Sequence, residues 1–332
     1  MLSLERNEGM QPTKHRKKLV IIGGGTGLST LLRGLKKFPL DITAIVTVAD
    51  DGGSSGRLRH EYDIPPPGDV RNVLAALSEV EPLVEEMFQY RFSHSEELNG
   101  HSLGNLMLAA LTSITGDFAH AITEMSRVLN IRGKVLPAAN QIVTLHALFE
   151  DRTTVMGESQ IPKYGKKIEK VFITPTDVKP LPETINVIRQ ADVIVIGPGS
   201  LYTSILPNLL VQDIQKAIRK SKAKKVYICN LMTQAGETGN YSAYDHVNAL
   251  IEHVGENFLD AVLISKEEIP ESVRYIYKQE QASPVKIDID QLEKLNIDIV
   301  KKDISVVHDG AVRHDATEVA KWLVEYADGL KT

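Results

Sequence analysis

The chain has 332 residues, of which 42% are hydrophobic and 24% charged, with a formal net charge of −5 and a sequence pI of about 6.1. This composition is ordinary for a globular protein, and the acidic balance argues against a nucleic-acid binder. The single cysteine, Cys229, excludes an intrachain disulfide. The polar tail 1–17 lacks the apolar core of a signal peptide, and no stretch has the ~20 apolar residues of a membrane helix, so we expect a cytoplasmic protein without membrane insertion.

The first half of the chain predicts strands that end in glycine-rich loops, followed by helices. Residues 19–22 and 42–48 are apolar runs typical of strands buried on both faces of a parallel sheet. Helical spacing predicts helices over 28–38, 70–78, 83–92, 103–115 and 118–129. Residues 131–175 change character and predict a β-rich insertion with short strands at 135–136, 142–149, 153–156 and 171–174.

The helix–strand rhythm then resumes. We expect strands at 193–196, 226–228, 259–265 and 304–307, and helices over 182–190, 201–210 with a break at Pro207, 212–220, 242–253 and 316–328. The pattern predicts one α/β domain over 18–332, with a Rossmann-like three-layer parallel sheet and a β-rich insertion at 131–175. Four of the strands end in loops rich in glycine and hydroxyl groups, and such loops share one edge of a parallel sheet. That edge is the predicted site of a phosphate-bearing ligand.

The first loop has the context that phosphate binding needs, directly after a strand and before a helix. Missing side chains let a ligand approach the backbone, and the helix N-terminus offers free N–H groups. Leu28 occupies the position of the third glycine in the dinucleotide fingerprint, so NAD specificity does not follow. The alternative is a tight turn packed against its helix. The candidate residues are Gly24, Gly25, Thr26 and Gly27.

The second loop begins with Asp50 and Asp51. A carboxylate here suits either a ribose or a magnesium ion that bridges to substrate phosphates. Two adjacent carboxylates rarely face the same way, so we assign the metal to Asp50 and expect the other to cap a turn. A mobile surface loop is the alternative. The anion-binding groups that follow are Gly52, Gly53, Ser54 and Arg57.

Two helix starts and two further loops complete the candidate site. Asp69 is interpreted as a helix cap, and His101 is as consistent with a structural role as with a functional one. The helix starts contribute Asn72 and Asn105. The third and fourth loops can bond phosphate oxygens and the polar edges of a base or sugar, through Gly197, Gly199, Ser200, Thr203, Ser204, Asn230, Thr233, Gln234 and Glu237.

These loops, in this order, resemble the family that joins archaeal 2-phospho-L-lactate transferase (CofD) to the bacterial YvcK-like proteins, often named gluconeogenesis factor. The resemblance covers nearly everything from Lys18 to the C-terminus. The segments that carry it are Ile22-Gly23-Gly24-Gly25-Thr26-Gly27, Ala49-Asp50-Asp51-Gly52-Gly53-Ser54-Ser55-Gly56-Arg57-Leu58-Arg59, Gly68-Asp69-Val70-Arg71-Asn72, His101-Ser102-Leu103-Gly104-Asn105, Gly197-Pro198-Gly199-Ser200-Leu201-Tyr202-Thr203-Ser204 and Met232-Thr233-Gln234.

The resemblance implies a Rossmann-like fold, a homodimer and a bound nucleotide. The transferase branch uses magnesium, and its metal-binding acid matches Asp50. The bacterial branch implies a UDP-N-acetylglucosamine binder that acts in cell shape and wall synthesis during gluconeogenic growth. Its late ligand residues match Arg313 and Tyr277, with Tyr275 as the alternative to the tyrosine. A regulatory protein partner is compatible with this reading.

Three functions therefore stay open at this point. The first is a ligand-sensing regulator of a UDP-sugar, because no nucleophile or general base is evident. The second is a magnesium-dependent transferase of a phospholactyl-type group, which acts on a derivative of a nucleotide such as GDP and needs only positioning and a metal. The third is an NAD(P)-binding protein, which Leu28 disfavours.

Overall fold

The computed structural model describes residues 16–94, 96–308 and 310–329, so nearly all of the predicted tail 1–17 lies outside the described residues. Its centre is a seven-stranded sheet in the order β10-β9-β8-β7-β1-β2-β3, and every neighbouring pair is parallel. The predicted parallel sheet is thus confirmed. Its strands are β1 (Lys18–Gly23), β2 (Asp41–Val46), β3 (Lys134–Pro137), β7 (Val193–Ile196), β8 (Lys224–Ile228), β9 (Ala261–Ser265) and β10 (Asp298–Lys302).

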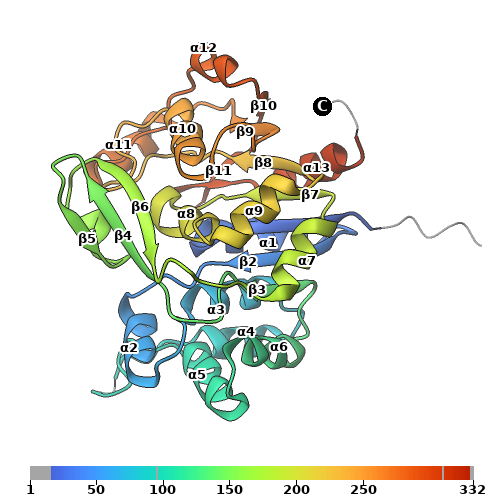
Figure 1. The fold of residues 1–332 in the computed structure, drawn as a ribbon, viewed down its shortest axis with the longest axis vertical. Helices are drawn as coiled ribbons and strands as arrows, with labels where there is room; N and C mark the ends of the chain where they lie inside the picture. The colour runs from blue at the N-terminus through green and yellow to red at the C-terminus, as the bar shows by residue number, and fades with distance from the viewer. Residues whose placement is uncertain (1–15, 95, 309, 330–332) are drawn as a thin grey trace, which may run out of the picture.

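Helices cover both faces of the sheet and form the predicted three layers (Figure 1). The chain passes from β1 to β2 in one direction and from β7 to β8 in the other. Right-handed crossovers therefore place the connecting helices on opposite faces. One layer contains α1 (Gly25–Leu35), α3 (Gly68–Leu77) and α13 (Ala316–Ala327), and the other contains α7 (Pro182–Gln190), α8 (Leu206–Leu209) and α9 (Gln212–Lys220).

The strand order reverses between β1 and β7, which lie side by side. At such a switch point the loops after the two strands diverge and leave a crevice where ligands bind in open α/β sheets. The apolar residues of β1 and β7 are almost completely buried, as expected for central strands. The sheet thus places the first and third glycine loops together at this crevice.

The insertion is a separate three-stranded antiparallel sheet in the order β5-β4-β6. Its strands are β4 (Thr144–Phe149), β5 (Thr154–Met156) and β6 (Ile168–Thr174). They are the green strands at the left of Figure 1. The predicted strand at 135–136 is not part of it, because β3 pairs with β2 in the main sheet. Short apolar runs do not reveal which sheet they join.

Two local predictions were wrong. The second loop continues into helix α2 (Gly53–Tyr62), although its glycines and serines are poor helix formers. The expected break at Pro207 lies instead at residues 210–211, because Pro207 occupies the first turn of α8, where its missing N–H costs nothing. A π-helical turn, Leu201–Ile205, precedes it.

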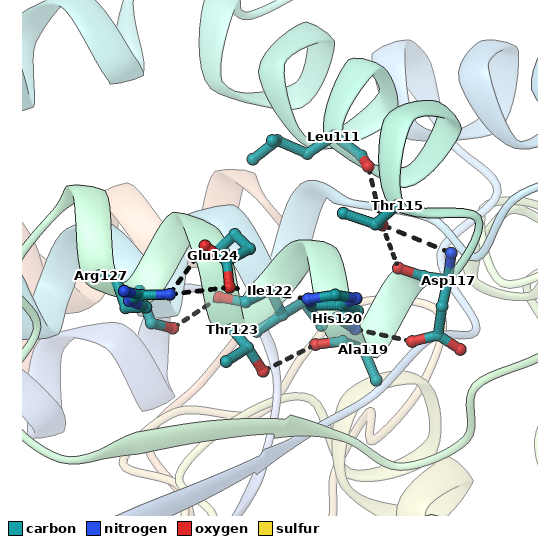
Figure 2. A network of polar contacts seen from close by, with 10 residues as sticks. Leu111, Thr115, Asp117, Ala119, His120, Ile122, Thr123, Glu124 and Arg127 are labelled. Carbon is teal, nitrogen blue, oxygen red and sulfur yellow. Dashed lines mark hydrogen bonds and ion pairs between the residues drawn. The ribbon is translucent and has the colours of Figure 1, made fainter.

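Helices α5 (Leu103–Thr115) and α6 (Phe118–Val128) meet at a closely capped corner, and the predicted bounds of α5 are confirmed. Gly116 adopts a left-handed φ of 73°, which glycine accepts without strain. Asp117 caps α6 by accepting from the His120 amide at 2.7 Å, and the Thr115 hydroxyl donates to the Leu111 carbonyl at 2.8 Å (Figure 2). In the part of the chain that the structure describes, no helix is long and apolar enough to cross a membrane.

The other described elements flank this framework. Near the C-terminus a two-stranded antiparallel hairpin packs beside helix α11. These elements are α4 (Pro82–Gln89), α10 (Ala243–Val254), α11 (Glu271–Gln279), α12 (Ile289–Leu292), β11 (Ser305–His308) and β12 (Ala311–His314).

Candidate functional site

The first glycine loop turns β1 into α1 at the switch point. Gly25 has a left-handed φ of 68°, and a Cβ at Gly24 would lie 2.7 Å from Asp69 Oδ2. The Gly25 amide donates to Asp69 Oδ1 at 3.0 Å, while Gly24, at the N-cap, has no side chain to offer the other amides of the first turn. The loop therefore presents backbone N–H groups of α1 toward the crevice.

The third glycine loop packs directly on the first. A Cβ at Gly27 would lie 2.9 Å from the Pro198 carbonyl oxygen, so a larger residue would push the loops apart. The π-helical turn is closed by a bond of 3.0 Å from the Ile205 amide to the Ser200 carbonyl. Ser204 Oγ would lie 3.5 Å from a Cβ at Gly25. Turns of this kind are frequent at functional sites.

The two loops form one side of a pocket of about 400 Å³, which we call the switch-point pocket. Its other walls come from the fourth loop, from α11 and from β12. Among the described residues that line it, Arg313 is a cation and none is a carboxylate. The predicted residues that line it are Gly25, Thr26, Gly27, Gly199, Ser200, Ser204, Asn230, Thr233, Gln234, Tyr277 and Arg313.

Tyr277 and Arg313, the two site residues expected late in the chain, both line the pocket, and one hydrogen bond links the segments that carry them. The hydroxyl of Tyr277 accepts a bond of 2.9 Å from the Val312 amide, which fixes the hairpin that carries Arg313. Tyr275 is 66% exposed and does not line the pocket. His314 lines it, donates from Nε2 to the Cys229 carbonyl at 3.0 Å, and has a pKa lowered to about 4 by burial. It is therefore neutral at pH 7.

Glu237 and Thr203 lie outside this lining. The Thr203 hydroxyl donates to the Glu237 carboxylate at 2.9 Å, and the Gln234 side-chain amide does so at 2.9 Å. Glu237 is 4% exposed, and burial raises its pKa to about 7. The Glu237 carboxyl thus links the fourth loop, through Gln234, to the third loop, through Thr203.

The carboxylates of the second loop diverge. Asp50 accepts from the Gly52 amide at 2.9 Å, whereas Asp51 accepts from the Ser159 amide of the insertion at 2.8 Å. Both carboxylates therefore accept from the backbone of a turn, and the assignment of a metal to Asp50 stays a prediction. Arg57 donates to the Asn99 carbonyl, away from the glycine loops.

The residues of α2, α3 and α5 form a second polar cluster. Ser54 Oγ lies 2.9 Å from His101 Nδ1 and accepts from Asn105 Nδ2 at 3.0 Å. Asn72 accepts from Arg71 at 2.6 Å. The predicted residues outside the switch-point pocket are Gly24, Asp50, Asp51, Gly52, Gly53, Ser54, Arg57, Asn72, Asn105, Gly197, Thr203 and Glu237.

Two further acids lie near Asp50. Asp69 was interpreted as the cap of its own helix, but its carboxylate accepts from the Gly25 amide of α1, and Glu158 was missed. Burial, with Asp50 nearby, raises the pKa of Asp69 to about 7. Burial, with Asp50 and Asp69 nearby, raises the pKa of Glu158 to about 8. The pair Gly68-Asp69 could have signalled the first, but Glu158 lies in a polar stretch without a motif. Burial beside Asp50 disfavours further negative charge, so at pH 7 Glu158 is mostly protonated and Asp69 is partly protonated.

The described side chains alone do not form a metal site, so a bound metal ion would take part of its coordination from water and from the phosphates of a ligand. Within residues 16–94, 96–308 and 310–329, no group of three or more His, Cys, Asp or Glu side chains is placed to hold one. Magnesium, however, often takes one or two carboxylates and completes its shell with water and substrate phosphates. Asp50 fits that use.

The comparisons with known proteins agree on one family. The model described as 2-phospho-L-lactate transferase CofD matches residues 19–305. The chain is 61% identical over 310 residues to a protein of Bacillus subtilis (strain 168) called gluconeogenesis factor, covering 93% of this chain and 98% of that one. A protein of Listeria monocytogenes with the same name is 48% identical, covering 93% and 95%. A crystal structure of a Bacillus halodurans protein has a TM-score of 0.92 at 59% identity, covering 93% and 100%.

Proposed function

The chain belongs to the 2-phospho-L-lactate transferase CofD family, and from this membership we propose that it is a regulatory protein that binds UDP-N-acetylglucosamine. Relatives at 48–61% identity over most of their length are called gluconeogenesis factor. We propose that ligand binding serves cell shape and wall synthesis during growth on gluconeogenic carbon. The homodimer and the regulatory protein partner expected from the family resemblance stay predictions.

The observation that carries the proposal is the switch-point pocket. Two glycine loops and the N-terminus of α1 meet there, with Arg313 as the cation and without a carboxylate among the described lining residues. Backbone N–H groups and one arginine suit the two phosphates of a nucleotide-sugar. Hydroxyl and amide groups from Ser200, Thr233 and Gln234 suit its sugar hydroxyls.

The same lining favours binding over turnover. Its histidine is held neutral with a pKa of about 4, so it is a poor base at pH 7. Its arginine is held beside the hairpin backbone, where Nη1 donates to the Val312 carbonyl at 3.1 Å. These groups can orient and neutralise a diphosphate without activating a nucleophile.

Isothermal titration calorimetry with UDP-N-acetylglucosamine, GDP and NAD tests the proposal. We expect the UDP-sugar to bind, and Arg313→Ala to weaken it by about 1.5–3 kcal/mol, roughly 10- to 150-fold, because a charged hydrogen bond to phosphate is lost. Arg127→Ala is the matched control, since Arg127 is 75% exposed and pairs with Glu124 on α6. Tight binding of GDP or NAD with no heat from the UDP-sugar would overturn the proposal.

The acidic groups beside the first loop favour a second candidate, a magnesium-dependent transferase. After burial, the charge of Asp50 is the next cause of the raised pKa values of Asp69 and Glu158, and a divalent cation would relieve that repulsion. Asp50 would hold the ion together with ligand phosphates, and the ion would polarise a phosphoryl oxygen. In the calorimetric series, GDP binding that requires magnesium would support this candidate over the regulator.

A further inference from the structure

A second cavity lies next to the switch-point pocket along the same edge of the sheet. It has a volume of about 300 Å³ and lies at the ends of β8 and β9, so we call it the β8–β9 pocket. The two cavities share Asn230 and Leu231 in their linings. A ligand that fills both would therefore run from the switch point across β8 to β9.

The walls of the β8–β9 pocket differ from those of its neighbour. Just over half of its lining residues are apolar, and charged groups from Lys266, Glu267, Glu268 and Arg274 lie among the others. Burial raises the pKa of the Cys229 thiol to about 12, so this residue presents a neutral surface. The apolar residues of the lining are Cys229, Leu231, Ala243, Ile264, Ile269, Pro284, Val285 and Ile287. Such walls suit a flat ring better than a phosphate or a sugar.

Asn230 provides a polar group at the junction of the cavities. Its Nδ2 donates to the Gly199 carbonyl at 3.0 Å, which orients the amide. Its Oδ1 is buried and has no hydrogen-bond partner among the described residues. An unpaired buried acceptor is costly, and a ligand N–H group would remove that cost.

We infer that the β8–β9 pocket binds the nucleobase of a nucleoside diphosphate sugar whose phosphates occupy the switch-point pocket. This inference rests on the proposed function and assigns the direction of the ligand along the sheet. The base is a pyrimidine with an imide N–H, as in uracil, which donates to Asn230 Oδ1. Cytosine has an acceptor at the same ring position and therefore binds less well.

The test fills the β8–β9 pocket from its rim. Ile287 lines it and is 42% exposed, so Ile287→Trp can place an indole over the cavity without disturbing the core. We expect the affinity for UDP-N-acetylglucosamine to fall on the order of tenfold or more, because the base loses its buried contacts. The affinity for inorganic pyrophosphate stays unchanged. Ile114→Trp, at a 78% exposed position on α5, is the matched control.

The outcomes separate this inference from the proposed function. If wild-type protein binds UDP-N-acetylglucosamine and Ile287→Trp binds it equally well, the base lies elsewhere and only the inference is overturned. If wild-type protein does not bind the UDP-sugar, the proposed function itself fails. A comparison on wild-type protein needs no variant: UDP should bind more tightly than CDP and pyrophosphate, and equal affinities for all three would overturn the inference.

Discussion

The polar side chains of the candidate site differ in the partners that they already have within the protein. A tyrosine beside the pocket was expected, and only Tyr277 of the two candidates lines it, because its hydroxyl contacts the backbone of β12. Glu237 was expected to read a base or sugar, but its partners are Thr203, Gln234 and the Tyr202 amide. A sequence lists polar groups without showing which are already paired within the protein.

Glu237 leads to a prediction about stability. Its ordinary pKa of 4.5 is raised to about 7 by burial, so between these values the folded chain holds a proton that the unfolded chain has released. Raising the pH across this window therefore favours unfolding. The contribution of the protonated Glu237 carboxyl to the free energy of unfolding is lost as the pH rises through 7. From pH 5.5 to pH 8 the free energy of unfolding should therefore fall in wild type. We expect this fall to be smaller by roughly 2 kcal/mol in Glu237→Gln, which has no carboxyl to titrate.

Urea unfolding of both proteins at these two pH values measures the difference. Asp69 also has a raised pKa and remains in both proteins, so its contribution cancels. The contribution of Glu158 cancels only in part, because Glu237 is one of the smaller causes of its raised pKa. Parallel pH profiles for the two proteins would contradict the assignment of a buried, protonated carboxyl to Glu237.

At the scale of elements, periodic segments were predictable and tertiary adaptations were not. The bounds of α5 and α7 follow from regular apolar spacing and clear terminal residues. Helix α2 was missed because its helical form depends on contacts elsewhere: a Cβ at Gly56 would lie 2.0 Å from the Asp51 carbonyl oxygen, and Ser54, Ser55 and Leu58 are buried. Local propensity alone favours a loop for such a sequence.

The attachment of the insertion gives a prediction at this scale. Asp51 accepts from the Ser159 amide, and a Cβ at Gly157 would lie 2.4 Å from Asp51 Oδ2, so this carboxylate holds the turn of the insertion next to the second loop. We expect Asp51→Ala to speed hydrogen exchange at residues 157–163 by about tenfold, because the partly buried Ser159 amide loses its acceptor. Mass spectrometry of exchanged peptides measures it.

A matched control lies in the same insertion. Asp151 binds Lys166 at 2.7 Å and Tyr164 at 2.8 Å, so Asp151→Ala removes a carboxylate of equal charge without touching the Ser159 amide. Exchange at residues 157–163 that rises equally in both variants would show a general loosening of the insertion and contradict a specific role for Asp51.

At the scale of the whole molecule, the parallel sheet followed from the sequence because its central strands are apolar throughout, while a ligand site at its edge stays a prediction. The edge strand β10 was missed, since Asp298–Lys302 is rich in charged residues and only partly buried. The separation of the predicted residues into a switch-point pocket and a second cluster around Ser54 also could not be predicted, because it depends on the path of α2 and α5 over the sheet.

The switch-point pocket is lined by residues from Gly25 to His314, so a ligand bound there would depend on the folding of nearly the whole described chain. A ligand that binds only the folded state raises the free energy of unfolding by about 2.7 kcal/mol when present at 100 times its Kd. With the 10- to 150-fold weaker binding expected for Arg313→Ala, the same ligand concentration should raise it by roughly 1.4 to 0.3 kcal/mol. Thermal unfolding with and without UDP-N-acetylglucosamine measures both increments. Equal increments would mean that the ligand binds away from Arg313, because only a site that includes this guanidinium transmits its loss to the stability of the complex.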